Sequence, residues 1–85
     1  MRIFKIGKLY QPTGTMKISA FEDYKTIKAW ASGFAVVGAF TEIRGPFLVL
    51  QTRYVDGDFL QVLYEDKCLW ARAPYVNCEQ IGDIE

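Results

Sequence analysis

The sequence predicts one mainly β domain over residues 1–85, a small and strongly bent barrel of five strands preceded by one short helix. A length of 85 residues suits a single domain. Short apolar runs follow one another at close spacing, separated by turn residues, as they do in small β-barrels. Two of these runs flank Asp56-Gly57, and this dipeptide between apolar runs is the strongest short-range signal for a β-hairpin.

The N-terminal segment predicts a first strand followed by a turn. Apolar residues alternate weakly over residues 2–10, which is the period-two pattern of a strand. The turn is predicted at Gln11-Pro12-Thr13-Gly14, because proline fixes φ and glycine accepts a positive φ.

A helix is predicted next, over residues 20–31. Ser19 and Glu22 match a capping box, in which each side chain bonds a backbone N–H group of the first turn. Apolar side chains then recur at helical spacing. A second interpretation stays open, in which residues 15–21 and 26–30 are the two strands of another hairpin.

The rest of the chain repeats a pattern of short apolar run and turn. Arg44-Gly45-Pro46 and Glu65-Asp66 predict corners, and Pro74 favours a single helical turn at residues 73–76, since proline is tolerated in a first turn. The predicted strands are residues 34–40, 47–55, 58–64, 67–71 and 78–81.

The hairpin is apolar on both faces, although a hairpin with one solvated face should alternate apolar and polar residues. A two-residue turn at Asp56-Gly57 would pair Tyr54 with Phe59, Leu50 with Leu63, Arg53 with Leu60 and Val49 with Tyr64. In a chain this short, a second copy of the protein is expected to cover the extra face. That intersubunit face is predicted to consist of Val49, Leu60, Val62 and Tyr64, because Gln51 and Arg53 lie beside them.

Composition also favours association, since 51% of the residues are hydrophobic and large exposed apolar patches usually mark interfaces. The net charge is zero, but residues 1–44 carry seven basic and three acidic groups (+4), and residues 45–85 carry three basic and seven acidic groups (−4). Opposite poles would suit head-to-tail packing, which closes into rings when the rotation permits. The alternative is an ordinary mixed and solvated surface.

Several classes of function lack their characteristic residues. The chain has no histidine, and Cys68 and Cys78 do not form the paired motif of zinc or redox sites. Both cysteines are expected to be small buried hydrophobes, with a disulfide as the alternative. No nucleophile–base pair or glycine-rich phosphate loop is present, so we expect no enzyme, cofactor or metal. No signal peptide or membrane span is visible, which makes the cytoplasm the default location.

Part of the chain resembles the second half of Src-homology-3-like (SH3-like) barrels. There, a strand, a tight turn, a strand and a one-turn helix precede the last strand. Residues 58–64, 69–71 and 74–76 follow this order and cover about a third of the chain.

The order of elements along the whole chain is similar to that of Sm-like proteins, including divergent phage and bacterial types. These share the small SH3-like barrel and place a capped helix ahead of a five-stranded bent sheet. Ile43-Arg44-Gly45 is similar to the short basic-glycine signature of the second Sm motif. The resemblance implies a homo-oligomeric ring of about five to seven subunits, with Arg44 near a base-binding pocket at the pore.

Two functional hypotheses follow. The first is binding of single-stranded RNA, in which Lys25, Lys28 and Arg44 contact phosphates and Tyr24 or Trp30 stacks on bases. The second is an SH3-like protein-interaction or structural module, phage or bacterial, with no nucleic-acid role. The same aromatic and apolar residues would serve its protein interface.

Overall fold

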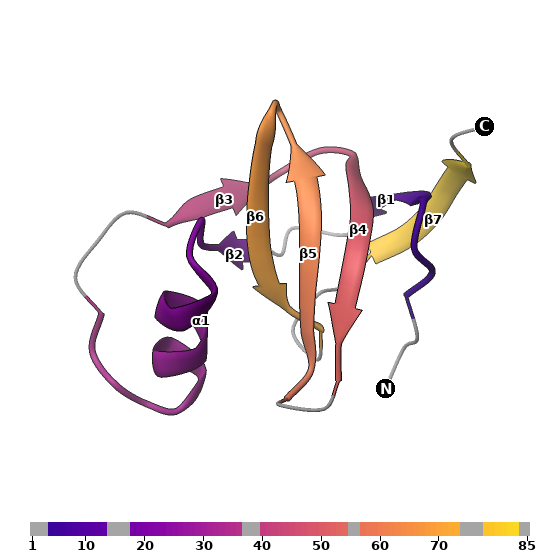
Figure 1. Cartoon of the computed structure of the whole chain (residues 1–85). Coiled ribbons are helices and arrows are strands. Elements are labelled where there is room, and N and C mark those ends of the chain that lie inside the picture. The colour runs from indigo at the N-terminus through magenta and orange to yellow at the C-terminus, as the bar shows by residue number, and fades with distance from the viewer. Residues whose placement is uncertain (1–3, 14–17, 37–39, 55–56, 74–77, 84–85) are drawn as a thin grey trace.

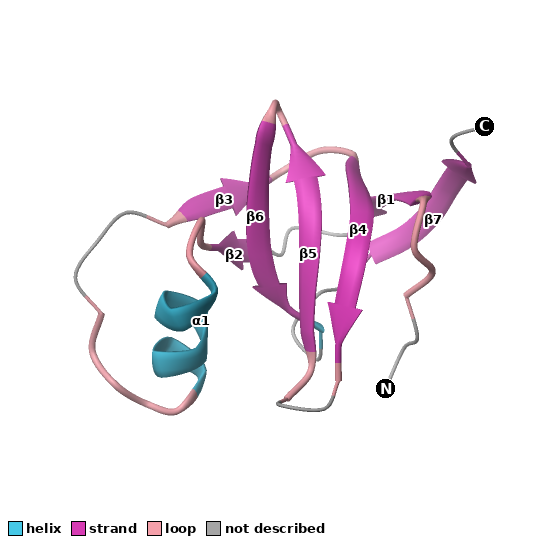
Figure 2. Cartoon of the chain, in the orientation of Figure 1, coloured by secondary structure: helices cyan, strands magenta, loops and turns pink. Residues whose placement is uncertain are grey.

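The computed structural model describes residues 4–13, 18–36, 40–54, 57–73 and 78–83. These residues form seven strands and one α-helix, so the mainly β prediction is confirmed (Figures 1 and 2). The elements in chain order are β1 (Lys8–Pro12), β2 (Ile18–Ala20), α1 (Tyr24–Ala31), β3 (Thr41–Ile43), β4 (Phe47–Arg53), β5 (Phe59–Tyr64), β6 (Lys67–Arg72) and β7 (Cys78–Asp83).

The strands form two antiparallel sheets. The larger sheet has the order β6-β5-β4-β1-β7, and the smaller one pairs β2 with β3. Within the described residues the sheets do not close into a barrel, so the closed five-stranded barrel is not what the structure shows.

An isolated antiparallel bridge joins the two sheets at Phe21 and Trp70. The Phe21 N–H donates to the Trp70 carbonyl over 2.9 Å, and the Trp70 N–H donates to the Phe21 carbonyl over 2.6 Å. Because Phe21 directly follows β2, this bridge holds the small sheet beside β6. Helix α1 begins three residues later and is therefore placed next to the same strand (Figure 1).

The main core lies between the two sheets. Strand side chains point alternately to opposite faces, so one face of β4, β5 and β6 supplies a continuous apolar surface. The small sheet adds Ile18, Ala20 and Ile43 to the same cluster. The largest fully buried side chains of this cluster are Phe47, Ile43, Leu60, Leu69, Val49 and Val62.

The four side chains predicted to meet a neighbouring copy are part of this core, which corrects that prediction. Val49, Leu60 and Val62 are fully buried and Tyr64 is 8% exposed within a single chain. The physical reason is that the β2–β3 sheet of the same chain covers them. The opposite face is the one that turns outward, as the 38% exposure of Leu63 shows.

The predicted register of the hairpin is also wrong. Arg53 pairs with Phe59, so five residues, rather than two, separate the first paired positions of β4 and β5. The register then shifts between Val49 and Gln51, because Leu50 is an extra residue in β4. A shift of one residue in register moves a strand's side chains to the other face of the sheet. The pairing inferred from the turn therefore placed Arg53 on the same face as Leu60, whereas it shares a face with Phe59. The predicted turn residue Asp56 lies outside the described residues.

The N-terminal predictions are partly confirmed. The first strand starts at Lys8 and includes the first two residues of the predicted turn, up to Pro12, because it pairs with β7 as far as Cys78. Helix α1 occupies the last two thirds of the predicted helix, which contradicts a strand at residues 26–30. The predicted capping residue Ser19 belongs to β2 instead, and Asp23 occupies the N-cap position.

The later elements agree more closely with the sequence. Glu65 and Asp66 form a tight turn with φ values of 48° and 66°, and strands follow at residues 67–72 and 78–83. The predicted strand at residues 34–40 is wrong at its described ends, since the Phe34 N–H bonds back to the Ala29 carbonyl and β3 starts only at Thr41. Residues 74–76 of the predicted helical turn lie outside the described residues.

Strand β1 pairs with β7, so backbone segments from the basic half and the acidic half of the sequence are neighbours at this edge of the sheet. The opposite poles stay a prediction. The cysteine prediction is confirmed for one residue of two. Cys78 is buried as predicted, but Cys68 is exposed, and both are free thiols.

Leu60 and Leu63 of β5 provide a matched test of the two faces. We expect Leu60→Ala to lower the free energy of unfolding by about 3 kcal/mol, because it leaves a cavity in a fully buried site. Leu63→Ala should cost less than about 1 kcal/mol, since Leu63 is already 38% exposed. Urea denaturation of both variants measures the difference, and equal losses would contradict the assignment of faces.

The β5–β6 turn gives a second stability prediction. Asp66 has a φ of 66°, a left-handed conformation that glycine adopts without steric cost. Asp66→Gly should therefore raise the free energy of unfolding by about 0.5 kcal/mol, and Asp66→Ala should lower it. Thermal unfolding followed by circular dichroism compares the two, and a stabilising alanine would be inconsistent with this backbone conformation.

Candidate nucleic-acid interface

Helix α1 places two of the predicted RNA-binding residues on one flank. Asp23 starts the helix: its side-chain oxygen accepts a hydrogen bond from the Thr26 hydroxyl over 3.1 Å. Ile27 is fully buried and anchors the helix on the sheet. Tyr24 and Lys28 are four residues apart, so they are neighbours on the helix surface.

The outer face of the larger sheet carries a cationic row that crosses three strands. Arg53 of β4 pairs with Phe59 of β5, and Phe59 pairs with Arg72 of β6. Directly paired residues of antiparallel strands point to the same face, so the two arginines lie on either side of one phenylalanine. Phe59 is 3% exposed because the helix covers it, whereas Arg53 is exposed.

Tyr24 connects the helix to this row. Its ring meets Phe59 edge-on at a centroid distance of 5.5 Å and lies 4.7 Å from the Trp70 ring. The Arg53 Cζ atom lies 4.4 Å from the centre of the Tyr24 ring, which is a cation–π contact. The Tyr24 ring is therefore packed against Arg53, Phe59 and Trp70, and it is not a freely exposed surface for base stacking.

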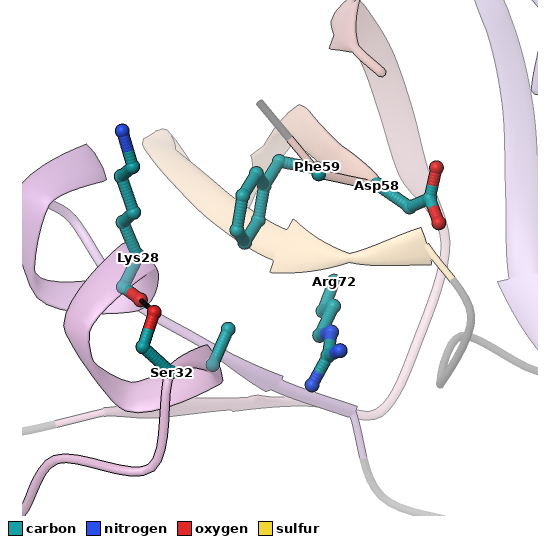
Figure 3. Close-up of a pocket in the computed structure, with 7 residues that line it drawn as sticks. Lys28, Ser32, Asp58, Phe59 and Arg72 are labelled. Atoms are coloured by element: carbon teal, nitrogen blue, oxygen red, sulfur yellow. Dashed lines mark hydrogen bonds between the residues drawn. The ribbon is translucent and has the colours of Figure 1, made fainter. Parts of the chain in front are cut away.

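A cleft of about 230 Å³ lies between the end of α1 and the paired positions of β5 and β6. Figure 3 shows the Arg72 side chain directed toward the helix end at Ser32, while the Asp58 carboxylate points away from the helix. The Ser32 hydroxyl donates to the Lys28 carbonyl over 2.9 Å, so it helps to end the helix. The lining residues are Lys28, Ala31, Ser32, Gly57, Asp58, Phe59 and Arg72.

The next row on the same outer face is polar. Gln51 pairs with Gln61, and the Gln51 side-chain amide donates to the Gln61 side-chain oxygen over 2.6 Å. Gln61 in turn pairs with Trp70 of β6. Amide groups that flank a cationic row can hydrogen-bond to the edges of unstacked bases.

Arg44, the residue singled out by the Sm-like resemblance, lies elsewhere. It is in the connection between β3 and β4. In Figure 1 this connection runs across the upper part of the molecule, whereas α1 lies at the lower left. Its guanidinium donates from both Nε, over 3.2 Å, and Nη2 to the Glu42 carboxylate. This hydrogen bond, with the charge of Glu42, raises the pKa of Arg44, so its cation is locally compensated.

The structure thus places Tyr24 and Lys28 beside the cationic row, has Lys25 on the same helix, and separates Arg44 from them. It adds Arg53 and Arg72, which sequence reasoning missed as site residues. The sequence did contain a signal for both arginines. Arg53 lies within the predicted strand at residues 47–55, and Arg72 directly follows the predicted strand at residues 67–71. The misplaced hairpin register set Arg53 opposite Leu60, on the face that proves to be the core.

We searched the described residues for a metal-binding cluster and for a membrane-spanning helix. There, no group of three or more cysteine, aspartate or glutamate side chains could hold a metal ion. Among the same residues, no helix has the length and hydropathy that a membrane crossing requires.

Comparisons with protein-family models, with curated proteins and with solved structures return no match for this chain.

Proposed function

We propose that the protein binds single-stranded RNA on the outer face of β4, β5 and β6, beside helix α1. The observation that carries the proposal is the row Arg53–Phe59–Arg72 next to Lys28 and Tyr24. With Lys25 on the exposed side of the helix, four of the chain's ten basic residues belong to α1 or to this row.

The side chains fit the chemistry of an unpaired strand. Lysine and arginine bind phosphates, and single-stranded bases stack on aromatic rings or on arginine guanidinium planes. Arg53 lies over Tyr24 on one side, so a base would stack on the opposite side of its guanidinium. Gln51 and Gln61 lie one row further along the strands, within the path of a neighbouring nucleotide.

Zero net charge limits the expected affinity of one site, because non-specific binding draws its free energy from counterion release. Several copies in one assembly would present the same site repeatedly, and avidity would strengthen the binding. Self-association of the chain, whether as a dimer or as the ring that the Sm-like resemblance implies, would supply these copies.

We expect the Lys25→Gln/Lys28→Gln variant to bind a labelled single-stranded oligouridylate more weakly than the wild type. Each lost phosphate contact should reduce the slope of log K against log salt by about 0.7. Arg53→Gln should weaken binding as well, because it removes both a cation and the stacking plane over Tyr24. Fluorescence anisotropy across a salt series measures affinity and slope together.

Two matched controls use cations outside the site. Lys67→Gln changes an exposed lysine at the opposite end of β6 from Arg72, and Arg44→Gln changes a cation already bonded to Glu42. Neither should alter RNA binding. No binding by the wild type at low salt would refute the proposal, and a loss with Arg44→Gln but not with Lys28→Gln would move the site to the β3–β4 connection.

A further inference from the structure

Three aromatic side chains are exposed on the other flank of α1 and in the segment that follows it. Phe34 is 68% exposed, Phe40 is 53% exposed and Trp30 is 38% exposed. We call these three residues the aromatic surface. Exposed aromatic rings in such a small chain are unusual, because they are the residues that contribute most to cores and interfaces.

Two ring contacts and one backbone hydrogen bond position the residues of the aromatic surface on the fold. The buried ring of Phe21 lies 5.6 Å from the Trp30 ring and 6.2 Å from the Phe40 ring, measured between centroids. The Phe34 N–H bonds to the Ala29 carbonyl over 3.1 Å, which fixes this residue beside the last turn of α1. Figure 2 shows this helix and the following segment at the end of the molecule remote from β7.

The aromatic surface is separate from the RNA site. Trp30 and Lys28 are two positions apart on α1, which rotates them by about 200° around the helix axis. Lys28 therefore borders the cleft with Phe59 and Arg72, while Trp30 points to the opposite flank, toward Phe21.

The charge pattern indicates what covers this surface. Residues 29–41 contain no charged side chain, the longest uncharged run in the sequence. Such a surface offers no ion pair to an acidic or basic partner. It is, however, compatible with itself, because a two-fold contact brings identical patches together without repulsion between like charges.

We infer that a second copy of the chain binds here, in a two-fold symmetric contact of aromatic surface against aromatic surface. A standard interface buries about 800 Å² on each partner, and weak transient contacts bury less. Scaled by their exposed fractions, the three rings offer roughly 240–400 Å² together, and the exposed residues Gly33 and Ala35 extend this area. The area suits a weak dimer whose population depends on concentration. A two-fold contact closes at two copies and leaves both RNA sites on outer flanks, so it rests on observations independent of the proposed function.

Sedimentation velocity over a concentration series tests the inference. The wild type should change from a monomer to a dimer as concentration rises. The Phe34→Ser/Phe40→Ser variant should raise the dissociation constant of the dimer by about tenfold or more, because each substitution acts twice in a symmetric contact. The control is Ile6→Ser/Ile81→Ser, which changes exposed apolar residues outside the aromatic surface and should leave the dimer intact.

Tryptophan fluorescence gives a second readout. Of the two tryptophans, Trp70 is 7% exposed and should report no change, whereas Trp30 should shift its emission to shorter wavelength as the dimer forms. Four results would overturn the inference: a wild type that stays monomeric at every concentration, an assembly of five to seven copies, equal loss in the control variant, or a monomer that binds phosphatidylcholine vesicles through Phe34. RNA binding can fail or succeed independently of each of them.

Discussion

The short antiparallel bridge between Phe21 and Trp70 is the contact on which the rest of the structure depends. Its two backbone hydrogen bonds join the small sheet to the β6 edge of the large one. The small sheet then covers the inner face of β4, β5 and β6 with Ile18 and Ile43. Because one chain supplies this cover itself, the apolar arms of the hairpin need no neighbouring copy to be buried.

The same bridge determines which side chains turn outward. Once the inner face is filled, strand alternation directs Arg53, Phe59 and Arg72 to the outer face. Helix α1 packs on this face through Ile27 and Tyr24, and so covers Phe59 but not Arg53. The cationic row is thus a direct consequence of where the core lies.

Helix α1 separates two surfaces of different chemistry. An eight-residue helix is marginal in isolation, so its place depends on the burial of Ile27 against Phe21, Phe59 and Trp70. On one flank, Tyr24 and Lys28 meet two arginines of the sheet. On the other, Trp30 joins an uncharged and exposed aromatic surface. This arrangement would let one small domain bind a polyanion and associate with itself without competition between the two.

Local signals in the sequence determined the mainly β class, most of helix α1, the Glu65-Asp66 turn and the last two strands, because periodicity and turn chemistry act over a few residues. They also drew attention to Tyr24, Lys25 and Lys28 on one helix. Only the tertiary structure decided the rest. Strand β1 pairs with β7 from the far end of the chain, where Gln11 donates to Glu79 across 68 positions. Which face of the hairpin is buried depends on the extra residue Leu50 in β4 and on the β2–β3 sheet that covers that face. A local sequence pattern cannot predict such a contact, because it forms between segments that are distant in the chain.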